Sequence, residues 1–169
     1  MLNASEGLAR ILPANVRILI IGVGNEYRSD DAVGILIARR LRELSLNRVT
    51  VIEKSGEGTE LMESWKNADN VILIDAVASG AKPGTIHRFD ARARPIPASY
   101  FRCSTHAFGV GEAIELARTL NRLPANLTVF GIEGKVFNTG TGLSPDVQEA
   151  TGQVVELVLL QIRALGQIG

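Results

Sequence analysis

The sequence predicts a three-layer α/β fold, in which helices cover both faces of a twisted, mostly parallel five-stranded sheet with one antiparallel strand. Two observations carry this prediction. Short apolar runs rich in β-branched residues alternate along the chain with segments whose apolar residues recur at helical spacing. The first and third of these runs are almost free of polar residues, as is typical of strands buried on both faces.

The first expected strand covers residues 17–24, a continuous apolar run that ends in glycines. Apolar residues at helical spacing then predict a helix over residues 31–44, with Ser29 or Asp30 as its N-cap. Residues 48–53 are rich in β-branched side chains and are expected to form the second strand.

A shorter helix is expected over residues 58–67, and its inward side chains are Leu61, Met62 and Trp65. Residues 70–75 have the same apolar character as the first strand, and they predict the third strand.

The fourth expected strand, residues 85–90, follows the third after only nine residues, 76–84. A parallel return needs a crossover of about a dozen residues or more. The short connection, which contains Gly80 and Pro83, therefore favours a hairpin. We expect this strand to be antiparallel and to lie at or near a sheet edge.

Residues 91–103 contain Pro95 and Pro97 and are expected to be irregular. A helix is predicted over residues 106–121, with Ser104 or Thr105 as its cap.

The fifth strand is expected over residues 127–133, followed by a glycine-rich loop. Ser144 is expected to cap a long last helix that has Pro145 in its first turn. The predicted apolar stripe of this helix includes Val147, Ala150, Val154, Leu157, Val158 and Leu165.

The 169 residues are expected to form a single domain, with residues 1–15 as an N-terminal extension and 16–165 as the α/β domain. The formal charge of zero argues against a general nucleic-acid binder and against a polybasic membrane anchor. Residues 1–15 lack the features of a signal peptide, and no apolar run is long enough to cross a bilayer. A single cysteine, Cys103, fits a reducing compartment. We therefore expect a cytoplasmic protein, and a monomer because no long exposed apolar stripe is evident.

Three polar positions fall at the carboxyl ends of the expected strands, where ligands of α/β sheets bind. Two adjacent carboxylates, Asp30 and Asp31, follow the first strand, Asp75 ends the third, and His106 opens a helix. One imidazole and two carboxylates suit a divalent transition metal with open positions for substrate. A helix N-terminus would also keep His106 neutral, as a metal ligand must be.

Each position also has a structural interpretation. Asp30 can be a helix cap, Asp31 a partner of the helix dipole, and Asp75 the acceptor of a structural hydrogen bond. His106 can be held by nearby backbone groups, and His87 is expected at the surface.

Two further hypotheses compete with a metal site. Cys103 stands three residues before His106, so a thiol nucleophile activated by that histidine is conceivable. Gly22 and Gly24, with Glu53 at the end of the next strand, resemble a dinucleotide-binding pattern. However, Tyr27 replaces the third glycine of that pattern, and two aspartates at the helix start would repel a diphosphate.

Five segments in order resemble the nickel–iron hydrogenase maturation endopeptidases. They are GVGNEYRSDDAVG (22–34), SGEGTELM (55–62), ILIDAV (72–77) followed by PGT (83–85), STHAFGV (104–110) and GLSPDV (142–147). The likeness extends from about residue 16 to residue 165.

The resemblance implies an endopeptidase that removes the C-terminal extension of a hydrogenase large-subunit precursor after nickel insertion. It places the metal-contacting and catalytic positions on Asp31, Asp75 and His106. The nickel is expected to arrive with the substrate, so that the protein holds no resident metal of its own. Asp31 or Asp75 is the candidate general base.

Three positions near the motifs receive no catalytic role. Glu53 replaces an aspartate that is common at that strand end in the family, and Asn25 and Asp30 are expected only to shape the first loop. The main alternative function is a nickel-dependent escort protein that recognises the loaded precursor without cutting it.

Overall fold

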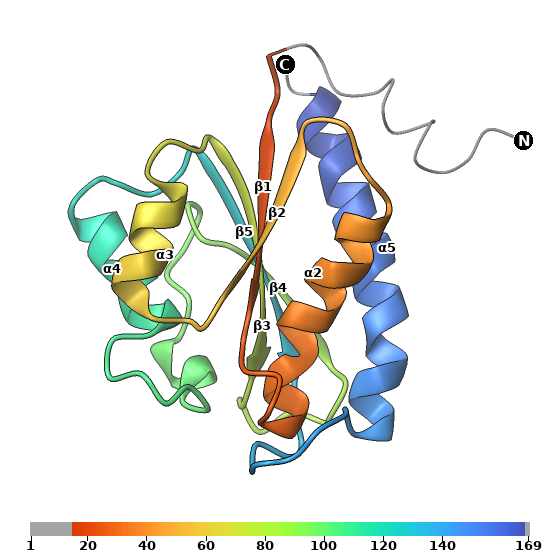
Figure 1. Cartoon of the computed structure of the whole chain (residues 1–169). Helices are drawn as coiled ribbons and strands as arrows, with labels where there is room; N and C mark the ends of the chain where they lie inside the picture. Colours follow the sequence, from red (N-terminus) through yellow and green to blue (C-terminus); the bar gives the residue numbers. More distant parts are fainter. Residues whose placement is uncertain (1–14, 168–169) are drawn as a thin grey trace, which may run out of the picture.

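The structure, a computed structural model, describes residues 15–167 and has the predicted three layers (Figure 1). Its elements, in order, are β1 (Ile18–Val23), the 3₁₀ helix η1 (Ser29–Ala32), α2 (Val33–Glu43), β2 (Val49–Lys54), α3 (Gly58–Trp65), β3 (Asn70–Val77), β4 (Ile86–Asp90), the 3₁₀ helix η2 (Ala98–Phe101), α4 (Val110–Thr119), β5 (Asn126–Glu133) and α5 (Pro145–Gln167).

The five strands form one sheet in the order β2-β1-β3-β5-β4. All neighbours are parallel except β4, which is antiparallel to β5 at the sheet edge, as predicted. The expected hairpin between the third and fourth strands is wrong, because β5 lies between them. The connection from β3 to β4 can be short because β4 lies only one strand beyond β3 in the sheet, on the other side of β5.

Helices α2 and α5 cover one face of the sheet, and α3 and α4 cover the other (Figure 1). Each face has its own apolar core. Side chains of α5, including Val154 and Val158, pack on one face, and Leu61 and Trp65 of α3 pack on the other. The central strands β1 and β3 are therefore buried on both sides, which explains their nearly unbroken apolar sequence.

Gly34, in the first turn of α2, lets this helix approach the ends of β1 and β3. A Cβ atom at this position would lie 2.3 Å from the carbonyl oxygens of both Val23 and Ile74. No side chain is tolerated at such a distance, so glycine permits the close approach. The segment just before α2, which carries Asp31, is thereby held against the end of β3.

The two expected N-caps of this helix are wrong. Ser29 and Asp30 lie within the 3₁₀ helix η1, and α2 begins at Val33 after Ala32, without a side-chain cap. The carboxylate of Asp30 instead accepts hydrogen bonds from the loop that precedes α5.

The start of α4 also differs from the prediction. The helix begins at Val110, four residues later than expected, because the Gly109 N–H donates to Glu112 Oε2 at 3.1 Å and closes the first turn. Ser104 and Thr105 therefore do not cap it, and His106 lies in the preceding loop.

The last helix follows the prediction with two corrections. Leu157 is 36% exposed, whereas Ile162 is fully buried and belongs to the apolar stripe. Ser144 stands at the expected start, but its hydroxyl group donates to Asp30.

The described helices do not include one that combines the length and apolar character needed to cross a membrane. The predicted N-terminal extension, residues 1–15, lies outside the described residues except for its last residue.

Candidate functional site

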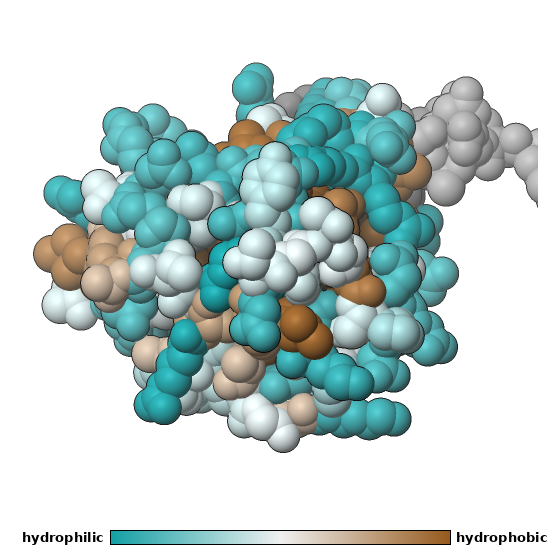
Figure 2. Space-filling model, turned by 60° about the horizontal axis from the view of Figure 1, so that its bottom comes forward, coloured by the Kyte–Doolittle hydropathy of each residue, from teal (hydrophilic) through white to brown (hydrophobic). Residues whose placement is uncertain are grey.

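Asp31, Asp75 and His106 line one small cavity at the carboxyl ends of β1 and β3, at the lower end of the molecule in Figure 1. The cavity has a volume of about 40 Å³, which is enough for a single ion or water molecule. Its other lining residues are Val23, Gly24, Asn25, Ser55, Cys103, Ser104 and Thr105. Figure 2 turns this end of the molecule forward and shows hydrophilic residues mixed with scattered apolar ones.

Asp75 is the most deeply placed carboxyl group of the cavity. It lies within β3, where its Cα is paired with that of Gly131 on β5, and it is only 5% exposed. Burial and the neighbouring charge of Asp31 raise its pKa well above the usual value, against one hydrogen bond from the Ala76 backbone. Two carboxylates in so small a space disfavour each other's ionised form.

Asp31 lies in η1 and is 7% exposed. Burial raises its pKa, while the positive charge of Arg28, a hydrogen bond from the Asn25 backbone and the nearby imidazole of His106 oppose this shift. The Arg28 Nη1 atom lies 4.0 Å from Asp31 Oδ2. The imidazole and the two carboxylates thus form one electrostatically connected group.

His106 reaches the cavity from the loop before α4, where it is half-buried. Its backbone N–H donates to Ser104 Oγ at 3.2 Å, and the carbonyl of Phe108 accepts from Gly58 N at 2.8 Å. Because the helix begins only at Val110, the expected effect of a helix N-terminus on this imidazole has no structural basis.

Asp30 has a structural role of a different kind from a helix cap. Its fully buried carboxylate accepts hydrogen bonds from the backbone N–H groups of Lys135, Val136 and Ser144 and from the Ser144 hydroxyl, at 2.6–2.9 Å. Burial raises its pKa, but the hydrogen bonds from Ser144 and the other donors outweigh burial, so the pKa is lowered. Asp30 therefore fixes the glycine-rich loop, residues 134–144, to the first loop.

Glu53 points away from the cavity. It accepts hydrogen bonds from Arg39, at 3.0 and 3.2 Å, and from Arg42, at 2.7 Å. Both arginines belong to α2. Their hydrogen bonds engage the carboxylate that a dinucleotide site would need to bind the ribose. Glu53 lines a neighbouring groove of about 380 Å³, which shares Gly24, Asn25 and Ser55 with the cavity.

Cys103 lines the cavity as a neutral thiol. Its Sγ lies 3.5 Å from the carbonyl oxygen of Ala76. Burial, followed by the charges of Asp75 and Asp31, raises its pKa to about 12. Because the thiolate is the nucleophilic form, the structure gives no support to the hypothesis of a cysteine nucleophile.

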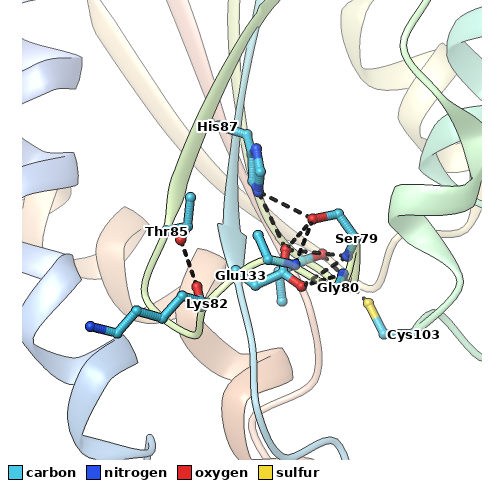
Figure 3. A network of polar contacts seen from close by, with 9 residues as sticks. Ser79, Gly80, Lys82, Thr85, His87, Cys103 and Glu133 are labelled. Carbon is cyan, nitrogen blue, oxygen red and sulfur yellow. Dashed lines mark hydrogen bonds and ion pairs between the residues drawn. The ribbon is translucent and has the colours of Figure 1, made fainter.

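A second polar cluster stabilises the connection between β3 and β4 (Figure 3). Glu133, at the end of β5, accepts from the N–H groups of Ser79 and Gly80 and from the Ser79 hydroxyl, and lies 3.3 Å from His87 Nε2. The side chain of His87, on the edge strand, is 18% exposed, so it is half-buried and not freely exposed as expected.

The donor set of the cavity suits a divalent transition metal in its chemistry. Two carboxylates and an imidazole face one space, and a cation there would relieve the repulsion between Asp31 and Asp75. However, within residues 15–167 no group of three His, Cys, Asp or Glu side chains is placed so that it could hold one metal ion, so Asp31, Asp75 and His106 share the cavity without forming a preformed metal site.

Arg28 is a feature of the site that sequence reasoning missed. It bonds to the carbonyl of Cys103 at 3.2 Å and approaches Asp31. A basic residue three positions before a candidate carboxylate is a signal in the sequence, but only the structure shows which side chains it joins.

Comparisons with known proteins agree with one another. A sequence model of the hydrogenase maturation protease family matches residues 35–161, which include Asp75 and His106. The hydrogenase 2 maturation protease of Escherichia coli is 29% identical over 155 residues, which cover 89% of this chain and 93% of that protein. A putative hydrogenase maturation protease of Methanocaldococcus jannaschii is 30% identical over 152 residues, or 86% and 96% of the two chains.

Solved structures show the same fold. The hydrogenase maturating endopeptidase HybD of E. coli superposes with a TM-score of 0.75 at 27% identity, over 89% of this chain and 94% of that one. The mostly parallel sheet with one antiparallel edge strand is therefore the fold of these endopeptidases.

Proposed function

The chain belongs to the hydrogenase maturation protease family, and we propose that it removes the C-terminal extension of a nickel–iron hydrogenase large-subunit precursor after nickel has been inserted. In this proposal the nickel is part of the substrate, and Asp31, Asp75 and His106 recognise it. The reaction takes place in the cytoplasm, and the protein acts as a monomer.

The observation that supports this proposal is the meeting of three distant residues in one cavity. Asp31, Asp75 and His106 come from η1, from β3 and from the loop before α4, and all three line a space of about 40 Å³. Such a space admits an ion but not a folded peptide segment. The peptide to be cut would therefore lie at the mouth of the cavity, beside its nickel.

The chemistry of the three side chains defines their proposed roles. Oxygen from Asp31 and Asp75 and a nitrogen from His106 complete the coordination of the substrate's nickel and so fix the adjacent peptide bond in place. One of the two carboxylates then takes a proton from the attacking water. Asp75 is the better candidate, because burial and the charge of Asp31 raise its pKa well above the usual value and so make its carboxylate the more basic of the two.

An escort protein that binds the loaded precursor without cutting it would use the same residues, so cleavage separates the two functions. We would mix the purified protein with nickel-loaded and nickel-free precursor and follow the precursor's mass over time. Loss of a C-terminal peptide from the loaded form alone is the expected result. Stable binding without a change in mass would favour the escort function.

Variants of the three side chains complete this experiment. We expect Asp31→Ala, Asp75→Ala and His106→Ala each to slow cleavage at least ~100-fold, the usual effect of removing a group that acts on the reacting atoms. Cleavage that survives all three substitutions would contradict the assignment of the site, although not the family.

A further inference from the structure

The side chain of Arg28 joins the two loops that carry Asp31 and His106. Its Nη1 atom donates to the carbonyl oxygen of Cys103 at 3.2 Å and lies 4.0 Å from Asp31 Oδ2. Cys103 precedes His106 by three residues in the same loop. The guanidinium group therefore lies at the junction of these loops, next to the cavity.

The backbone of Arg28 is fixed on two sides, so the place of its charge is well defined. Its N–H donates to the carbonyl of Asn25 at 3.1 Å, and it forms an isolated parallel β-bridge with Gly140 of the glycine-rich loop. The Arg28 side chain is 25% exposed. A partly buried charge in a fixed position acts more strongly on its neighbours than a mobile surface charge does.

The charge of Arg28 matters because the cavity would otherwise attract cations. Asp31 and Asp75 supply two carboxyl groups, with His106 as a nitrogen donor beside them. These three side chains attract free divalent ions from solution in the same way as they attract nickel on a precursor. A positive charge 4.0 Å from Asp31 offsets part of this attraction.

We propose that Arg28 is a positioning residue that balances the charge of the cavity, so that free divalent cations bind weakly while nickel carried by the precursor is accepted. This inference rests on the proposed function. The precursor binds through its own protein surface, so its nickel reaches the cavity at a high effective concentration. A free ion is not delivered by a bound protein, so the repulsion from Arg28 keeps the occupancy of the cavity by free ions low.

Calorimetric titration of nickel chloride into the purified protein tests this inference, with the parent and every variant measured at the same pH of about 8. Arg28→Gln and Arg28→Met remove the charge and are expected to bind free nickel about tenfold more tightly than the parent protein. Arg28→Lys keeps the charge and is expected to stay close to the parent affinity. Circular dichroism confirms that each variant is folded.

Arg42→Gln is the matched control, because it removes the same charge from a side chain that contacts Glu53 outside the cavity. It is expected to leave nickel affinity unchanged. Adding Asp31→Ala to Arg28→Gln is expected to abolish the gain, which locates the bound ion. Nickel affinity that is the same in the neutral Arg28 variants and the parent, undetectable in all of them, or raised equally by Arg42→Gln overturns the inference.

The cleavage assay keeps this result separate from the proposed function. Tighter nickel binding by the neutral variants supports the role of Arg28 even where no precursor is cut. Conversely, nickel-dependent cleavage with unchanged nickel affinity in these variants upholds the protease and overturns only the role of Arg28.

Discussion

Asp75 lies close enough to Asp31 that burial, together with the negative charge of Asp31, raises the pKa of the Asp75 carboxyl group well above the usual range. The two residues are far apart in the sequence but line the same cavity. Keeping both ionised costs stability, because each is removed from water and neither neutralises the other. In the proposed function, a cation brought by the substrate would offset this repulsion.

Asp75→Asn is expected to stabilise the protein and abolish cleavage. The substitution removes the charge repulsion with little change in shape. We expect the melting temperature at pH 8 to rise by ~2–4 °C, the shift that about 1 kcal/mol produces in a domain of this size. Thermal melting followed by circular dichroism measures the shift, and the precursor assay measures the loss of activity.

The same substitution has a pH dependence with a defined sign. Because the pKa of Asp75 is raised on folding, its favourable contribution is fully present below the unfolded value and is lost as pH rises through the folded value. The advantage of Asp75→Asn is therefore expected to shrink as the pH falls toward about 4. A constant difference from acid to alkaline pH would contradict burial and repulsion as its cause.

Asp30→Asn is expected to have the opposite effect on stability. An amide in this position turns a donor toward N–H groups that now bond to a carboxylate oxygen. We expect a loss of about 2–4 kcal/mol at neutral pH, measured by urea unfolding. Since folding lowers the pKa of Asp30, this loss should diminish as pH falls through the folded pKa. An unchanged unfolding midpoint would show that the loop does not depend on Asp30.

Gly34→Ala is expected to disturb the site through the fold. A methyl group there meets two carbonyl oxygens at 2.3 Å and would push α2 away from the ends of β1 and β3. We expect a loss of stability of about 1–3 kcal/mol. Gly152→Ala is the control: a Cβ there meets nothing within 4 Å, and alanine in a helix interior should add about 0.5–1 kcal/mol. Equal melting temperatures in the two variants would contradict the close approach at Gly34.

Glu53→Gln is expected to leave cleavage within about threefold of the parent rate, because Arg39 and Arg42 hold this carboxylate outside the cavity. The loss of stability should stay below about 1 kcal/mol, as is usual for partly exposed ion pairs. A loss of activity as large as that of Asp75→Ala would place Glu53 in the reaction.

The strands were predictable because their apolar runs are long and unambiguous, as in residues 70–75, and the antiparallel direction of β4 followed from a nine-residue connection. The insertion of β5 between β3 and β4 was not predictable from local sequence, since it depends on which strand pairs across the sheet. Helix starts were also misplaced. Asp30 looks like a cap, but its carboxylate is taken by a loop more than a hundred residues away.

The meeting of Asp31 and Asp75 was predictable because carboxyl ends of parallel strands share one edge of a sheet, whereas His106 reaches the same cavity from the loop before α4 and not from the predicted helix start. Their different environments were not. The adjacent Asp30 and Asp31 have pKa values shifted in opposite directions, and this depends on which of them faces the donors of the glycine-rich loop. The position of Arg28 between two loops likewise depends on tertiary structure.

The most direct measurement is nickel-edge X-ray absorption on the loaded precursor, alone and with the protein, under conditions in which cleavage is stopped by Asp75→Asn. If His106 binds the substrate's nickel, the complex should show additional scattering from an imidazole ring. The double variant Asp75→Asn with His106→Ala should not. Spectra that are the same with and without the protein, or an imidazole signal that persists without His106, would contradict recognition of the substrate's nickel by this site.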